Sequence, residues 1–113
     1  MTTELRIAVV LAALASACAL TDVPPIDLGS DAPPLARAGC ALVARRCTRC
    51  HPLDRVLGAR VSTPTQWRSY VRRMRLVPAS GIAPSEEAPI VECLVHRSFG
   101  ATGVAALHAE EEP

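Results

Sequence analysis

Residues 47–51 of this 113-residue chain read Cys-Thr-Arg-Cys-His. The two cysteines are three positions apart, which is within one turn of a helix, and the histidine follows the second cysteine directly. A haem held by thioether bonds requires two thiols at this spacing, so that both vinyl groups are reached, and an imidazole that turns under the iron. The stretch therefore matches the attachment signature of c-type haem, with Cys47 and Cys50 as thioether residues and His51 as the proximal iron ligand.

Two other uses of paired cysteines fit the sequence less well. A thioredoxin-like redox pair belongs to a strand-helix-strand unit, and no strand pattern is present here. A structural zinc site needs four ligands, and the sequence has no second pair of ligands at a suitable spacing. The motif therefore predicts one covalently bound haem c.

An apolar run, LRIAVVLAALASACAL, occupies residues 5–20 and follows a short charged start. We interpret residues 1–17 as a secretory signal peptide, because the run ends in small residues. It is shorter than the roughly 20 apolar residues that a membrane-spanning helix needs, so a retained transmembrane segment is the weaker alternative. The mature protein is expected to be exported.

The end of this run, Ala15-Ser16-Ala17-Cys18, resembles a bacterial lipobox. If the leader is cut before Cys18, acyl chains on this cysteine would anchor the protein to a membrane facing the periplasm. An ordinary cut after Ala17 fits the same residues and would leave the protein soluble in the periplasm. Both readings place it in the periplasm or the cell envelope.

The rest of the chain divides into three parts by composition. Residues 18–33 are rich in proline and aspartate, which predicts an extended and poorly ordered tether. Residues 101–113 end in Glu-Glu-Glu-Pro and are expected to form an acidic, disordered tail. Residues 34–100 form the folded domain, which is small enough that a covalent staple would help it.

Helical patterns fill that domain. The first, over residues 34–47, places Leu35, Gly39, Leu42 and Val43 along one face. No alternating strand pattern occurs, so the predicted fold class is all-α.

A second helix is predicted from Thr63, which is a suitable N-cap residue, with Pro64 at the first helical position and Gln66 at the capping-box position. A third is predicted from near Ser85 to Gly100, with acidic residues at its positive end.

Together these features resemble a known family. A helix that leads into Cys-x-x-Cys-His, a Trp-x-x-x-Val-x-Arg-Met helix at residues 67–74 and a final helix with an acidic start are similar to the small class I c-type cytochrome domains. Such monohaem domains occur as electron-transfer subunits or modules of periplasmic dehydrogenases. The resemblance implies three main helices around a covalent haem, with His51 as proximal and Met74 as distal iron ligand.

Met74 has a simpler interpretation as well, because a methionine in an apolar helical stripe often only fills a core. Once the leader is removed, however, Met74 is the only methionine left in the chain. The alternatives for the sixth position of the iron are His96, His108 and an open or water-ligated site. Thioether ligation would raise the potential above that of a bis-histidine haem, which favours an electron carrier over an oxygen-binding site.

The resemblance also gives a place to two further cysteines. In class I cytochromes the first and last helices cross at a glycine eight residues before the first haem cysteine, against an aromatic residue. Gly39 has this spacing, and Cys93 stands where the family has its tyrosine. In an oxidising compartment Cys40 and Cys93 are expected to form a disulfide, the alternative being two buried free thiols.

Charge is distributed unevenly. The chain has no lysine, and residues 34–100 hold eleven arginines against four acidic residues, a net of +7. This favours steering of an acidic redox partner or of the haem propionates, although a simply solvated arginine face is the alternative. Nucleic acid is not an expected partner, because the domain is exported and has three aromatic residues.

The sequence therefore predicts a monohaem c-type cytochrome that transfers single electrons. Its expected partners are redox proteins such as a periplasmic dehydrogenase or a terminal oxidase chain. No set of catalytic residues is visible, so an electron carrier is predicted and not an enzyme. The alternative is a haem-based sensor or gas-binding lipoprotein with an open or labile sixth ligand.

Overall fold

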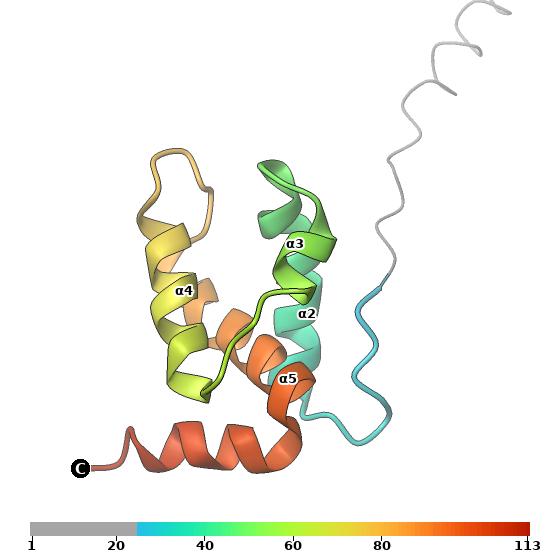
Figure 1. Ribbon diagram of the computed structural model, residues 1–113, viewed down its shortest axis with the longest axis vertical. Coiled ribbons are helices and arrows are strands. Elements are labelled where there is room, and N and C mark those ends of the chain that lie inside the picture. The colour runs from blue at the N-terminus through green and yellow to red at the C-terminus, as the bar shows by residue number, and fades with distance from the viewer. Residues whose placement is uncertain (1–24) are drawn as a thin grey trace, which may run out of the picture.

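The computed structural model describes residues 25–113, so the predicted leader and Cys18 lie outside the described residues. All regular secondary structure in the described part is helical and no strand occurs there, which confirms the all-α class. Figure 1 shows α5 running between α2 on one side and α4 on the other. The elements in chain order are α2 (Pro34–Arg46), the 3-10 turn η1 (Cys47–Arg49), α3 (Leu53–Leu57), α4 (Pro64–Leu76), the 3-10 turn η2 (Pro84–Glu86) and α5 (Glu87–Ala109).

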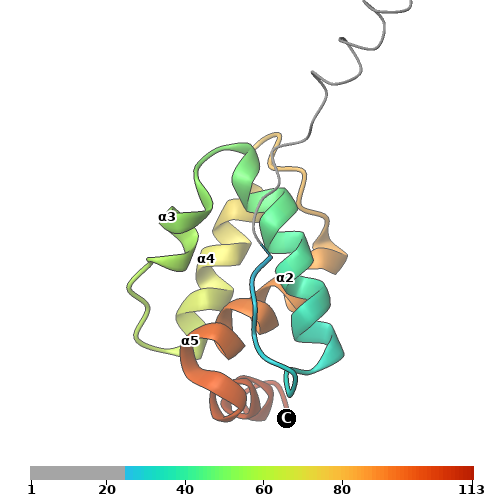
Figure 2. The same ribbon diagram turned by 90° about the vertical axis from the view of Figure 1, so that its right-hand side faces the viewer.

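Helices α2 and α5 cross at very short range (Figure 2). A Cβ placed on Gly39 would lie 1.7 Å from the carbonyl oxygen of Pro89, so only glycine allows this approach. The buried face of α2 consists of Ala36, Gly39, Cys40 and Val43. Leu35, expected on that face, is 47% exposed. The buried face thus includes Ala36 in place of Leu35, because the close crossing with α5 accommodates small side chains and not the larger leucine.

A disulfide joins the two helices at this crossing. It links Cys40 to Cys93 across 53 residues of sequence, with their Cα atoms 5.2 Å apart. Both cysteines are buried in the hydrophobic core. In the chain-entropy account, closing a loop of this length stabilises the domain by about 4 kcal/mol.

Helix α4 begins as its sequence predicts. The Thr63 hydroxyl accepts a hydrogen bond from the Gln66 backbone N–H at 3.4 Å, and the Gln66 side chain accepts from the Ser62 N–H at 2.6 Å. The helix buries Trp67 and Val71 against α5. The Trp67 indole N–H donates to the hydroxyl of Ser98 on α5 at 2.9 Å, which satisfies its one polar atom.

Helix α5 is the central element and bends once. Gly100 has φ 68° and ψ −166°, a backbone conformation that is essentially restricted to glycine. The helix then resumes and runs beneath the first turns of α4 (Figure 1). By length and composition residues 84–109 are apolar enough to cross a membrane, but half of the most apolar window is buried inside the domain. Their apolar character is thus the signature of a core helix.

The disordered tail predicted for residues 101–113 is wrong over most of its length. Helix α5 continues to Ala109 and buries Gly103, Val104 and Leu107. The prediction failed because it was based on the acidic end of the segment. The segment is also rich in alanine, which has a high helix propensity, and it has a short apolar face. We call residues 101–111 the C-terminal arm.

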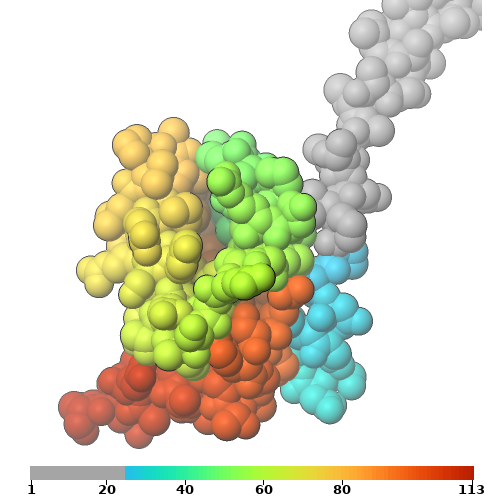
Figure 3. Space-filling model, in the orientation of Figure 1, coloured from blue at the N-terminus to red at the C-terminus, as the bar shows by residue number. Residues whose placement is uncertain are grey.

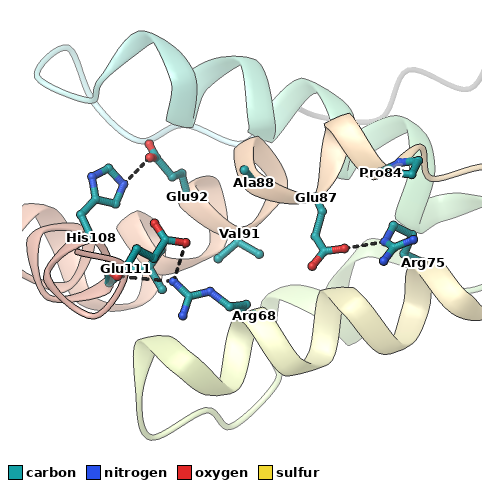
Figure 4. A pocket seen from close by; sticks show the side chains of 10 residues that line it. Arg68, Arg75, Pro84, Glu87, Ala88, Val91, Glu92, His108 and Glu111 are labelled. Carbon is teal, nitrogen blue, oxygen red and sulfur yellow. Dashed lines mark hydrogen bonds and ion pairs between the residues drawn. The ribbon is translucent and has the colours of Figure 1, made fainter. Parts of the chain in front are cut away.

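Polar contacts hold the C-terminal arm in place. The Arg68 guanidinium donates to the Leu107 carbonyl oxygen at 3.4 Å and pairs with Glu111 at 2.9 Å. On the other side of the arm, the His108 imidazole lies 2.6 Å from the buried carboxylate of Glu92 (Figure 4). The arm therefore ties the start of α4 to the first half of α5.

The predicted tether, residues 18–33, is attached to the domain over its described part. Residues 25–33 have no regular helix, but Ile26 and Leu28 pack against the core and Ala32 is buried. Figures 1 and 2 show this segment running beside α2. Its apolar residues alternate with prolines and aspartates, and for that reason the average composition predicted a free linker.

Replacing Gly39 by alanine tests the helix crossing. Gly39→Ala is expected to lower the free energy of unfolding by at least roughly 1–3 kcal/mol, because the new methyl group would overlap the Pro89 carbonyl. Denaturant unfolding of the oxidised protein measures this. The exposed Ala41→Ser change on the same helix is the control, and equal stability of the two variants would contradict the crossing.

Candidate haem-binding site

A cavity of about 430 Å3 lies between the Cys-x-x-Cys-His segment and α4. Figure 3 shows the hollow between the atoms of these two segments. Its size falls within the range of small-molecule and cofactor sites. Buried apolar side chains from α4 and α5 form its floor: Trp67, Val71, Ile90 and Leu94.

The two cysteines of the motif lie on one wall of this cavity. Cys47 sits in the turn that follows α2, and Cys50 ends that turn. Both line the cavity and carry free thiols. Burial raises the pKa of the Cys47 thiol. A dithiol redox pair needs a lowered thiol pKa, so this environment disfavours the thioredoxin-like interpretation.

His51 lines the same wall, directly after the second cysteine. Its Nδ1 atom lies 3.2 Å from the Pro52 carbonyl oxygen. A carbonyl can only accept, so in the neutral imidazole this contact favours the tautomer with the proton on Nδ1. In that tautomer Nε2 has the lone pair that a metal ligand needs.

Met74 and Tyr70 face the motif from α4, one helical turn apart. Met74 is 36% exposed and lies at the cavity, whereas the apolar residues beneath it, Trp67 and Val71, are buried. A methionine that only filled the core would be buried with them. Its thioether is therefore available to a ligand in the cavity.

The two other histidines lie elsewhere. Neither His96 nor His108 lines the cavity. His108 is held by Glu92 in a separate trough of about 350 Å3 between α4, α5 and the C-terminal arm (Figure 4). In residues 25–113 no three His, Cys, Asp or Glu side chains are grouped so that they could hold a metal ion. Of the residues predicted above as possible sixth ligands, Met74 is the one that lines the cavity.

The structure adds residues that the sequence did not single out. Arg55, on the short helix α3, and Arg60 both line the cavity. Five residues are too few for helix α3 to show a periodic pattern. The arginine content predicted cations near the motif, but no sequence signal showed which of them reach the cavity.

A loop after α4 forms the other lip of the cavity. The Ser80 hydroxyl donates to the Arg75 carbonyl oxygen at 3.0 Å and accepts from the Ile82 N–H at 3.3 Å. Gly81 has φ +73°, and a Cβ there would lie 2.0 Å from the Arg49 guanidinium. Arg49, between the two motif cysteines, thus reaches across to this loop.

One ion pair holds the motif end of α2 to the start of α5. Arg46 Nε and Nη2 donate to the Glu86 carboxylate at 3.0 and 2.7 Å. The hydrogen bond from Arg46, and after it the bond from the Ala83 N–H, lowers the pKa of Glu86. The Arg46 side chain also lines the cavity, so this pair fixes one edge of the site.

Comparison with protein-family models, with curated proteins and with solved structures finds no match to this chain. The assignment of the cavity therefore depends on the residues that line it. Four of them are the groups that the sequence predicted as haem attachment and iron-ligating residues: Cys47, Cys50, His51 and Met74.

We expect the Arg46–Glu86 pair to make the free energy of unfolding sensitive to acid. Because the pKa of Glu86 is below its ordinary 4.5 in the folded state, the pair stabilises the fold above that pH. This stabilisation is lost as the pH falls through the lowered folded pKa. Denaturant midpoints measured between pH 7 and about pH 3 should therefore fall less steeply for Glu86→Gln than for the wild type. The exposed Glu112→Gln change should keep the wild-type slope, and a Glu86→Gln profile parallel to wild type would contradict the prediction.

Proposed function

We propose that this protein is a monohaem c-type cytochrome that transfers single electrons. One observation carries the proposal: the two thiols and the imidazole of the attachment motif line the same cavity as the thioether of Met74, with the motif and α4 on facing walls. A haem bound by the motif would thus meet a second ligand of the kind found in electron carriers. The four residues come from segments more than 20 positions apart, so the fold brings them together.

The residues of the cavity fit a haem. The floor is apolar, as a porphyrin requires, while Arg55 and Arg60 supply cations for its propionates. His51 would ligate the iron through Nε2 in the tautomer that the Pro52 contact favours. When bound, haem supplies one-electron redox chemistry at its iron.

The chain's own contribution is attachment, orientation and exclusion of water. Cys47 and Cys50 would attach the haem to the wall formed by the motif. The buried side chains of Trp67 and Leu94 keep water from the floor of the cavity. No residue of the cavity is needed as an acid, base or nucleophile for electron transfer, so an enzymatic role is not part of the proposal.

The surface around the cavity fits an acidic protein partner. An apolar collar at the end of α4 consists of Tyr70, Met74, Leu76 and Val77, all exposed. Arg49, Arg55 and Arg60 lie beside it and, within residues 25–113, have no carboxylate partner. We expect the partner to be a redox protein such as a periplasmic dehydrogenase or part of a terminal oxidase chain, reached after export.

A second candidate function is supported by the exposure of Met74. A ligand at the edge of the cavity is more easily displaced than a buried one, and Met74 is 36% exposed. The protein would then be a haem-based sensor or gas-binding protein with a labile sixth ligand. The two functions differ in how the reduced iron responds to added carbon monoxide.

Covalent attachment is the first test. Haem should stay with the wild-type chain after denaturation and acid-organic extraction, because thioether bonds survive both. The Cys47→Ala/Cys50→Ala variant should release all of it under the same treatment. Absorbance of the protein and solvent phases measures the distribution. A wild-type protein that gains no haem in a host able to attach it would contradict the proposed function.

Met74 separates the carrier from the sensor. If its sulfur ligates the iron, the oxidised protein will show the weak far-red band of methionine-ligated ferric haem, and the reduced protein will bind carbon monoxide slowly or not at all. Met74→Ala should lose the band, bind carbon monoxide rapidly and have a lower potential. Because Met74 is partly exposed, the stability cost should be well below the roughly 2–5 kcal/mol of a buried methionine.

Met74→His is the matched control, since it keeps a ligand and exchanges sulfur for nitrogen. It should lower the potential without opening the iron to carbon monoxide. Rapid carbon monoxide binding by the wild type, with no far-red band, would place the sensor ahead of the carrier.

A further inference from the structure

We infer that this domain folds as a disulfide-bonded apoprotein and receives its haem in a preformed cavity, so that oxidation of Cys40 and Cys93 precedes thioether formation at Cys47 and Cys50. The haem part of this inference rests on the proposed function. The folding part rests on the described residues alone.

Most of the hydrophobic core lies outside the haem cavity. Four buried core residues line the cavity floor, and the rest of the buried core does not touch it. Those remaining residues are Cys40, Val43, Val91, Cys93, Val95, Val104 and Leu107. The core at the α2–α5 crossing and under the C-terminal arm is therefore formed by protein side chains that do not line the cavity.

The helices that form the cavity walls are also positioned by contacts away from it. The Cys40–Cys93 disulfide fixes α2 to α5. Helix α4 is fixed to α5 near both of its ends, by the Trp67–Ser98 hydrogen bond and by the ion pair of Arg75 with Glu87. Because both walls are fixed to the same helix, the space between them is set before any ligand enters.

The order of the two covalent reactions follows from the placement of the thiols. Cys40 lies in α2 at the crossing, whereas Cys47 lies in the turn that follows α2 and lines the cavity. The crossing at Gly39 brings Cys93 to Cys40, with a Cα separation of 5.2 Å. This pairing removes two of the four thiols of the domain and leaves the motif pair free.

The chemistry requires that one pair of cysteines is oxidised while the motif pair stays reduced. Disulfide formation removes two electrons and two protons from Cys40 and Cys93, and a disulfide donor accepts them and becomes a dithiol. Thioether formation adds the S–H of a cysteine across a vinyl group, so that one S–C and one C–H bond form without an oxidant. A motif cysteine that is already in a disulfide has no S–H to add. The haem-accepting form therefore has Cys40 and Cys93 joined and Cys47 and Cys50 as thiols, and thiol–disulfide exchange with a disulfide donor in the export compartment produces its disulfide.

The test uses the full chain carrying Cys47→Ala and Cys50→Ala, which cannot hold haem covalently. Without haem this variant should show a helical circular dichroism spectrum, a cooperative denaturant transition and no free thiol from Cys40 or Cys93. Adding a thiol reductant to the same sample should abolish the cooperative transition or shift its midpoint strongly downwards. A variant that is disordered while its disulfide is intact would overturn the inference.

A matched variant separates the contribution of the Cys40–Cys93 covalent bond to stability from that of apolar packing at the same positions. In the same background, Cys40→Ala/Cys93→Val keeps apolar side chains at the crossing and should behave like the reduced sample. If it unfolds at the same denaturant concentration as the disulfide-bonded parent, the disulfide is not the prerequisite that we infer.

Haem binding tests the preformed cavity. Added ferric haem should bind the folded, disulfide-bonded Cys47→Ala/Cys50→Ala variant reversibly, and binding should fall at least tenfold after reduction. An unfolded variant alongside a wild type that carries covalent haem would overturn this inference and leave the proposed function intact. A folded variant alongside a wild type that never carries haem would overturn the proposed function and leave the folding part of this inference intact.

Discussion

The close approach of the backbone at Gly39 to the Pro89 carbonyl determines how the rest of the molecule is arranged. It brings α2 and α5 together where no side chain fits between them, and the same crossing places Cys40 beside Cys93. Cys40 is held at this crossing, and the motif begins seven residues later at Cys47, on one wall of the cavity. Helix α5 then serves as the common support for α2, α4 and the C-terminal arm.

Charge in this domain is divided between structure and surface. The carboxylates of α5 and its flanking turns neutralise particular arginines: Arg46 pairs with Glu86, Arg75 with Glu87 and Arg68 with Glu111. These pairs hold helices together. Arg55 and Arg60, which line the cavity, and Arg49, which reaches the loop after α4, have no such partner within residues 25–113. These three arginines leave uncompensated positive charge at the proposed haem site, where it can attract an acidic partner.

Local signals predicted the elements well, and long-range packing limited the rest. The cap at Thr63 depends on a few neighbouring residues, and it occurs in the structure. The helix end predicted at Gly100 is only a kink, because the helix resumes after this residue and continues to Ala109. The exposed position of Leu35 depends on which face of α2 meets α5, which the helix pattern alone did not determine. The order of the C-terminal arm depends on Arg68 and Glu92, which lie far from it in sequence. The same limit applies to Arg55 and Arg60 at the cavity.

The anchoring of α4 determines how easily the Met74 sulfur could leave the proposed haem iron. The side chain is partly exposed, which by itself favours exchange. However, α4 is joined to α5 by Trp67 on one side of Met74 and by Arg75 directly after it. Moving the sulfur by a helix shift would break both contacts and expose the buried Trp67 indole. Rotation of the partly exposed Met74 side chain breaks neither contact. A ligand on a fixed helix suits an electron carrier, because a small rearrangement on oxidation and reduction permits rapid electron transfer. The anchoring of α4 therefore favours the carrier over the sensor.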